Sequence, residues 1–159
     1  MKTQSPYRLL PADRRVEIIS TLMRSKRETR AVFAQRLAAR GGGFRVATLV
    51  SWPVERLARE IVRLNAENAQ DELEMLQYLY VEMEPQIQMT FLDSAGVQHE
   101  QGVIPDDLES PYADVAGVER GAAAVVAAHG DSGRHYLRTI ARYNGAAWPG
   151  IDNVVAALI

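Results

Sequence analysis

A stretch of the chain without glycine or proline constrains the fold more than any other feature. It lies between Pro53 and Pro85, and its apolar residues recur at steps of three to five, the spacing of one helical face. A proline is tolerated in the first turn of a helix, and the residue before a proline disfavours helix. We therefore predict one long central helix over 53–84. The apolar stripe thins to alanines over 65–71, so a short break there is the alternative.

The sign of the charge reverses inside this stretch. Residues 1–64 hold 14 Lys and Arg against 5 Asp and Glu, whereas residues 65–119 hold 13 Asp and Glu and no Lys or Arg. The remaining residues, 120–159, carry 4 Arg and 2 Asp, which gives the whole chain its net charge of −2. The near-neutral total therefore conceals a basic N-terminal part and an acidic middle part.

The composition predicts one cytoplasmic domain. A chain of 159 residues with 47% hydrophobic residues suits a single α-rich domain over 1–159 with a sizeable core. No apolar run approaches the ~18 residues of a membrane span, and arginines stand where a signal peptide would be apolar, so we expect no membrane partner. The absence of cysteine excludes disulfides and thiolate chemistry. The excess of arginine over lysine indicates a bacterial GC-rich genome.

Further helices are expected on both sides of the central one. Basic N-terminal helices are predicted over 11–40, with Ser25 and Glu28 as a capping box for the second of them. The glycines of 41–43 end it, because successive glycines lose too much backbone entropy to continue a helix. C-terminal helices are predicted over 118–159, where small residues favour close helix contacts.

The segment after Pro85 changes its period. Apolar and polar residues alternate before the turn-forming sequence 93–96, which predicts a small β-hairpin over 86–104 and an acidic loop up to residue 117. A helix from Pro85 to Asp93 is the alternative, because the apolar residues there also share a helical face. The predicted fold class is mainly α, a compact helical bundle around the central helix with the hairpin appended.

Residues that could carry catalysis are scarce. His129, Asp131 and His135 form the only cluster of ligand-type side chains near a helix start, but their spacing matches no zinc pattern, and capping or surface roles are expected. The glutamates lack the Glu-x-x-His pairs of di-iron bundles, and no glycine-rich nucleotide motif occurs. We therefore expect no enzyme, no catalytic residue, no metal and no cofactor. A small metal-dependent enzyme is the third hypothesis.

The arginines of the N-terminal part give the clearest functional signal. Their density suits contacts with phosphates or with an acidic protein. The candidate binding residues are Arg24, Arg27, Arg30, Arg36, Arg40 and Arg45. The stretch 35–54 resembles a degenerate helix-turn-helix, with Leu49 and Trp52 as core residues of its second helix. Nucleic-acid binding through 24–45 is thus the alternative function.

The competing account pairs these arginines with carboxylates of the acidic part, in the same chain or in a second copy. Surfaces of opposite charge attract one another and fix the orientation of a contact, although a single surface ion pair contributes little to its free energy. The carboxylates expected to face a partner are Glu67, Asp71, Glu72 and Glu74. No family signature that we recognise is present. The sequence therefore predicts a non-catalytic binding or regulatory protein that acts through protein–protein contacts and forms a homo-oligomer.

Overall fold

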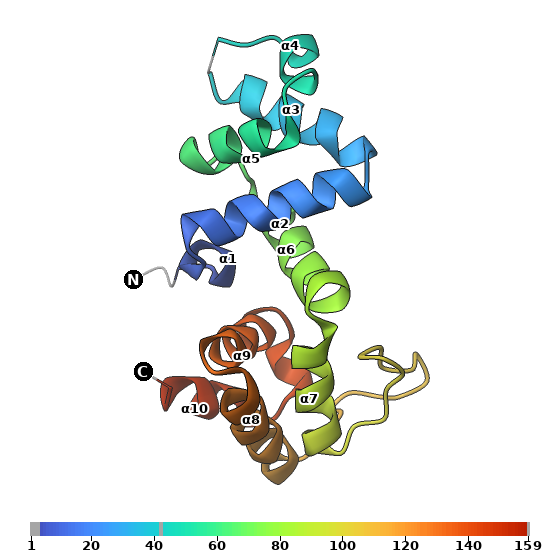
Figure 1. The fold of residues 1–159 in the computed structure, drawn as a ribbon. Coiled ribbons are helices and arrows are strands. Elements are labelled where there is room, and N and C mark those ends of the chain that lie inside the picture. The colour runs from blue at the N-terminus through green and yellow to red at the C-terminus, as the bar shows by residue number, and fades with distance from the viewer. Residues whose placement is uncertain (1–3, 42, 159) are drawn as a thin grey trace. The chain divides into compact units, whose positions relative to one another are not determined.

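The computed structural model describes residues 4–41 and 43–158, and it confirms a mainly α fold. Within these residues it has ten α-helices, a π-helical segment and a 3₁₀ segment, without any β-strand. The chain divides into two compact units, Met1–Tyr78 and Leu79–Ile159 (Figure 1). None of the described helices is long and apolar enough to cross a bilayer.

The first unit contains six helices. They are α1 (Pro6–Leu9), α2 (Ala12–Ser25), α3 (Glu28–Ala39), α4 (Val46–Val50), α5 (Val54–Arg63) and α6 (Ala69–Tyr78). The α2 helix packs against α5 and α6, and α3 packs against α4 and α5 (Figure 1). The core between them is formed by fully buried aliphatic side chains, among them Ile19, Leu37 and Leu57. Helices α2 and α3 thus occupy the range 11–40 expected to be helical.

The ends of α3 differ in detail from the sequence prediction. Ser25 is the last residue of α2, and no side chain caps the start of α3, so the predicted capping box with Glu28 is wrong. After the helix, Gly41 and Gly43 have positive φ angles of 91° and 74°, as expected of glycines that end a helix. Gly42 lies outside the described residues.

The prediction of one central helix over 53–84 is wrong, because α5 ends at Arg63. Asn65 adopts a left-handed conformation with φ 49°. The amide of Ala66 then donates to the carbonyl of Ile61 at 3.0 Å, and the amide of Asn65 donates to that of Val62 at 3.2 Å. These two bonds form a Schellman end, in which asparagine replaces the usual glycine.

A reciprocal cap restarts the chain as α6. The amide of Asp71 donates to the side-chain oxygen of Asn68 at 2.8 Å, and the amide of Asn68 donates to the Asp71 carboxylate at 3.0 Å. This is the arrangement of a capping box. The break therefore lies within 65–71, where the apolar stripe thins.

The second unit packs four helices around an aromatic cluster. Its elements are η1 (Leu79–Met83, π-helical), α7 (Pro85–Ala95), α8 (Val115–His129), α9 (Asp131–Asn144), η2 (Gly145–Ala147, 3₁₀) and α10 (Ile151–Ala156). The α8 helix lies along α7 and α9, and α10 contacts α8 and α9. At the centre the Phe91 ring lies edge-on to Tyr136 and Trp148, with centroids 5.7 and 5.0 Å apart.

The predicted hairpin over 86–104 is wrong, and the helical alternative is correct. In α7, Ile87, Phe91 and Leu92 are all buried on one side of the helix. The helical spacing of the apolar residues therefore determines the structure, and the alternation of apolar and polar residues does not. Gly96, with φ 77°, ends the helix instead of turning a hairpin. The only β pairing in the described residues is a single antiparallel bridge between Glu100 and Val103.

Close contact between α7 and α8 depends on glycine. A Cβ atom placed on Gly121 would lie 2.9 Å from the carbonyl oxygen and the ring of Phe91, and one on Gly117 would lie 2.9 Å from the carbonyl oxygen of Ala95. Such separations are shorter than van der Waals contact. Gly117 and Gly121 of α8 therefore set the distance between the two helices.

We expect Gly121→Ala to lower the free energy of unfolding by about 1–3 kcal/mol, because the methyl group overpacks the contact with Phe91. Helix propensity alone would act in the opposite direction, raising stability by about 0.5–1 kcal/mol. Urea unfolding of the two proteins distinguishes these outcomes by sign. A more stable variant would contradict the close packing of α8 on α7.

Candidate functional site

The carboxylates at the start of α6 do not face outward. Glu67, Asp71 and Glu72 are 5%, 4% and 9% exposed. A buried carboxylate is strongly destabilising unless it is paired and hydrogen-bonded. Two arginines of the same unit, Arg8 and Arg36, supply the opposite charge.

Arg8 connects α1 to the segment before α6 and to its first turn. Its guanidinium pairs with Glu72, donates to the side-chain oxygen of Asn65 at 2.8 Å and to the carbonyl of Glu67 at 3.0 Å. The neighbouring Tyr7 hydroxyl donates to the Glu67 carboxylate at 2.6 Å. Burial raises the pKa of Tyr7 above its ordinary value, and the charge of Glu67 raises it further.

Arg36 of α3 makes the second link. Its Nε donates to Asp71 at 3.0 Å, and a terminal nitrogen donates to the other carboxylate oxygen at 3.5 Å. The expectation that Glu67, Asp71 and Glu72 face a partner is therefore wrong, since their partners belong to the same unit. Glu74 is exposed and accepts a hydrogen bond from Gln70 at 3.1 Å.

The candidate arginines divide in the same way. Arg24 forms an ion pair with Glu55, as Arg36 does with Asp71. The half-buried Arg30 donates to the carbonyl of Trp52, and the exposed Arg40 donates to the carbonyl of Leu64 at 3.2 Å. Arg27 and Arg45 are exposed and form no ion pair with a described residue. Of the six predicted residues, Arg27, Arg40 and Arg45 thus retain exposed side chains without an ion pair to a described residue.

The helix-turn-helix outline is only partly present. Leu49 and Trp52 are buried, as expected of core residues, but the second helix, α4, has only five residues and ends before Trp52. A single turn is too short to lie along a DNA groove as recognition helices do. The structure therefore offers little support for a base-reading helix here.

The structure does not bring the three candidate metal-binding residues together. His129 contacts the Thr90 hydroxyl at 3.0 Å, Asp131 pairs with Arg134 at 3.0 Å, and the buried His135 contacts the Tyr80 hydroxyl. Among the described residues no group of three or more His, Asp or Glu side chains could hold a metal ion.

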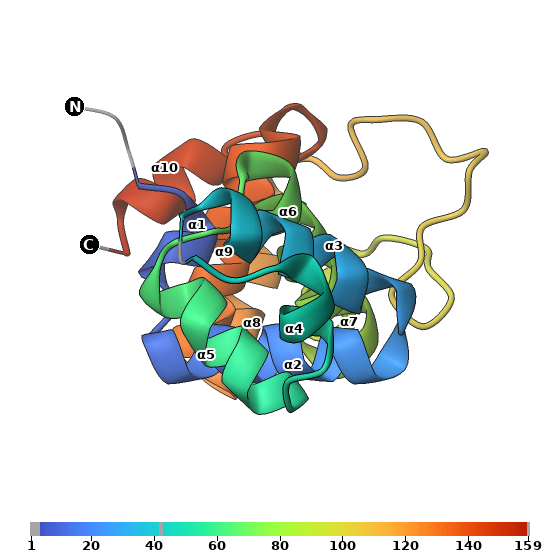
Figure 2. The ribbon, with the colours of Figure 1, turned by 90° about the horizontal axis from the view of Figure 1, so that it is seen from above.

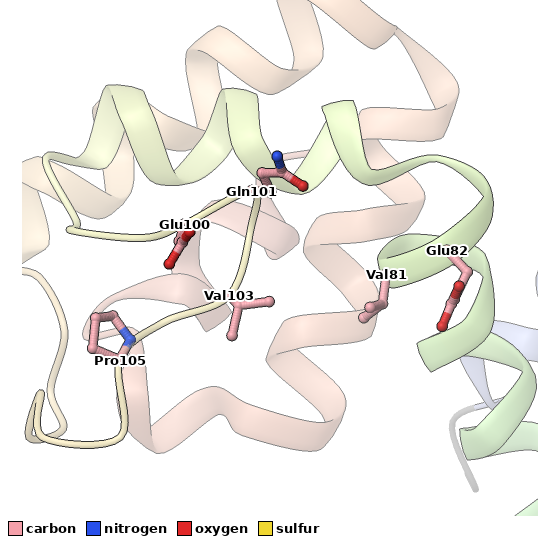
Figure 3. A pocket seen from close by; sticks show the side chains of 6 residues that line it. All are labelled: Val81, Glu82, Glu100, Gln101, Val103 and Pro105. Atoms are coloured by element: carbon pink, nitrogen blue, oxygen red, sulfur yellow. The ribbon is translucent and has the colours of Figure 1, made fainter.

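A surface hollow of about 570 Å³ in the second unit is a candidate site (Figure 3). It is lined by Val81, Glu82, Glu100, Gln101, Val103 and Pro105. Val81 and Val103 point toward one another across it and are 51% and 61% exposed. We call it the η1 hollow. It combines an apolar surface open to solvent with two carboxylates at its edge.

The π-helical turn and a long loop build the two sides of the η1 hollow. The amide of Glu84 donates to the carbonyl of Leu79 at 2.8 Å, five residues back, and such π segments often occur at functional sites. The turn buries Leu79 and Tyr80 while Val81 and Glu82 face solvent. The other side belongs to the loop between α7 and α8, which makes a wide excursion beside α7 (Figures 1 and 2). Loops of this length are uncommon and often functional.

Two contacts with α7 hold the loop in place. His99 donates from Nε2 to Asp93 at 2.5 Å, while its Nδ1 accepts the amide of Gly102 at 2.9 Å. Gln88 donates to the carbonyl of Gly102. Because these contacts hold the bridged turn 100–103, the wall of the η1 hollow is largely preformed.

The charge around the η1 hollow is negative. The second unit carries 11 Asp and Glu against 4 Arg, a formal charge of −7, whereas the first unit carries 14 Lys and Arg against 9 Asp and Glu, or +5. No Lys or Arg occurs between residues 65 and 119, and all four arginines of the second unit are in α8 or α9. The η1 hollow is therefore suited to a cationic ligand with apolar parts.

A second hollow, of about 450 Å³, lies between α8 and α10. It is lined almost entirely by alanine, valine and leucine, with Glu119 as the one charged residue. Few polar groups are available there to fix the orientation of a ligand. The η1 hollow is the more specific of the two.

Comparison with protein-family models, curated proteins and solved structures gives no match. The sequence analysis missed the η1 hollow, since it placed strands over 86–104. The available signals were Val81 next to Glu82, Val103 three residues after Glu100, and the length of the loop that follows α7.

We expect His99→Ala to accelerate amide hydrogen exchange at Gly102 and Val103 by about tenfold, because Gly102 loses its acceptor and Asp93 its donor. His129→Ala, which removes a side chain of α8, is the matched control and leaves these amides unchanged. Equal exchange rates in the wild-type protein and His99→Ala would show that the imidazole does not hold the loop.

The raised pKa of Tyr7 predicts a loss of stability at alkaline pH. Above about pH 10 the unfolded chain ionises this tyrosine while the folded protein keeps it neutral, so stability falls by up to about 1.4 kcal/mol per pH unit. Urea unfolding at about pH 9, 10 and 11 measures the slope. Tyr7→Phe should reduce the slope, whereas Tyr143→Phe, at an exposed site, should not. An identical slope in Tyr7→Phe would refute this assignment.

Proposed function

We propose that this chain is a non-catalytic binding protein of the bacterial cytoplasm that acts through protein–protein contacts and self-associates. The η1 hollow is the partner-facing surface, and the partner is a basic segment with apolar side chains. The observation that carries this proposal is the pair of exposed valines, Val81 and Val103, set between the carboxylates of Glu82 and Glu100.

The valines supply the attraction. Burying a valine side chain fully contributes about 1.5–3 kcal/mol, and here roughly half of each side chain still contacts water. A contact that covers both valines gains part of that free energy. The preformed wall of the loop lowers the conformational entropy lost on binding.

The carboxylates select the partner. Glu82 and Glu100 disfavour an acidic segment and orient a basic one, although exposed ion pairs contribute only about 0–1 kcal/mol each. A second copy of the chain is such a partner, because its first unit has a net charge of +5. This complementarity supports self-association.

Size-exclusion chromatography with light scattering tests the proposal. At about 0.05 M salt we expect a mass above the 17.6 kDa of one chain, which falls toward that value at about 0.5 M salt as the charges are screened. The double variant Val81→Ser, Glu82→Gln should be monomeric at both concentrations. Asp131→Asn, Asp152→Asn removes two exposed carboxylates elsewhere in the second unit and should behave as wild type.

A synthetic peptide of alternating lysine and leucine probes the η1 hollow directly. We expect it to bind the wild-type protein and the control variant, and to bind Val81→Ser, Glu82→Gln more weakly. A wild-type protein that is a monomer at both salt concentrations and does not bind the peptide would refute the proposed function.

A further inference from the structure

Trp52 holds together a group of side chains from the first unit. Its ring is 7% exposed and lies edge-on to Phe44, with ring centroids 4.9 Å apart. The guanidinium of Arg56 lies 3.9 Å from the centre of the Trp52 ring, and Arg30 donates to the Trp52 carbonyl. The segments around α3, α4 and α5 therefore meet in one packed cluster.

Further exposed arginines lie within one helical turn or one residue of this cluster along the chain. Arg27 precedes Arg30 by three residues on the edge of α3, Arg45 adjoins Phe44, and Arg59 follows Arg56 by one turn of α5. Arg27, Arg45 and Arg59 form no ion pair with a described acidic residue. We call the group the arginine–aromatic face; its members are Arg27, Phe44, Arg45, Trp52, Arg56 and Arg59.

We propose that the arginine–aromatic face binds single-stranded nucleic acid. Four exposed guanidinium groups provide contacts for phosphates, and the ring of Phe44, 42% exposed, provides a surface on which a base stacks. The contact with Trp52 fixes the Phe44 ring before a ligand arrives, which lowers the entropy lost on stacking.

The structure favours a single strand over a duplex. At ~1.5 Å per residue α4 is only about 7.5 Å long. Its exposed side chains are those of Ala47 and Thr48, so only one of them can hydrogen-bond to a base edge. A strand with unpaired bases, by contrast, needs only phosphate contacts and a stacking surface.

An exposed aromatic ring also distinguishes nucleic acid from an acidic protein. A peptide of glutamates meets the charge of the arginines but has no flat π surface to stack on Phe44. Binding to this face uses residues of the first unit alone. The variants that test it are in the first unit, whereas those that test the η1 hollow change Val81 and Glu82 of the second unit, so the two proposals can fail separately.

Fluorescence anisotropy of the full chain with a labelled oligo-dT of about 12 nucleotides tests the inference. We expect binding at about 50 mM salt that weakens as salt is raised. With four phosphate contacts, the slope of log K against log salt should be about −3, since each contact on a single strand contributes about −0.7.

Two pairs of variants separate the contributions of ring and charge. Phe44→Ala should weaken binding about tenfold to a hundredfold, whereas Phe44→Tyr, which keeps the ring, should retain it. Arg45→Ala, Arg59→Ala should weaken binding and make the salt slope shallower by about 1.4. Arg120→Ala, Arg142→Ala removes two exposed arginines of the second unit and should bind as wild type. Circular dichroism confirms that each variant is folded.

Several results would overturn the inference. They are the absence of binding at about 50 mM salt, tighter binding to a duplex of the same length, and equal competition by polyglutamate of matched charge. Unchanged affinity in Arg45→Ala, Arg59→Ala would do so even if Phe44→Ala failed to fold, because both arginines lie at the surface.

Discussion

The first unit depends on the pairing of three buried carboxylates with two arginines. Glu67 and Glu72 contact Arg8, and Asp71 contacts Arg36, so α1 and α3 are tied to the start of α6. Removing one member of such a set leaves a buried charge uncompensated, at about 3–5 kcal/mol, which exceeds the contribution of most surface contacts. The Asp71 carboxylate also accepts the amide of Asn68, and this hydrogen bond helps to fix where α6 begins.

This pairing changes which charges remain outside. It buries three acids of the first unit while Arg8 and Arg36 stay half-buried, so the surface of this unit is at least as basic as its net charge of +5 indicates. The acids of the second unit are mostly exposed, and those near the η1 hollow have no arginine within the same sequence segment. The two units therefore still differ in charge, but only some of the arginines that sequence density emphasised, Arg27, Arg40 and Arg45, remain exposed and without an ion pair to a described residue, and Arg59 joins them.

The sequence predicts helices well where one period dominates and poorly where two signals compete. Pro53 and Pro85 mark real helix starts, yet Asn65 and Asn68 end and restart the helix between them, since a left-handed asparagine and a capping side chain outweigh an apolar stripe that has thinned. In α7 the same apolar residues fit both periods, and only packing against α8 decides between them. The partners of Glu67 and Asp71 lie 59 and 35 residues away, which no local pattern reveals.

Both proposed surfaces occur where regular helix is interrupted. A long helix buries one face and presents charged side chains on the other, so it rarely leaves apolar side chains in water. At η1 the extra residue of the π turn places Val81 at the surface, and before α4 the irregular segment does the same for Phe44. A neighbouring packed group holds part of each surface in position: the His99 contact holds the loop that carries Val103, and the Trp52 ring holds Phe44. Exposed apolar groups that are held in this way lose little conformational entropy on binding, which is why we assign binding to these two places and not to the regular faces of α2, α5 or α9.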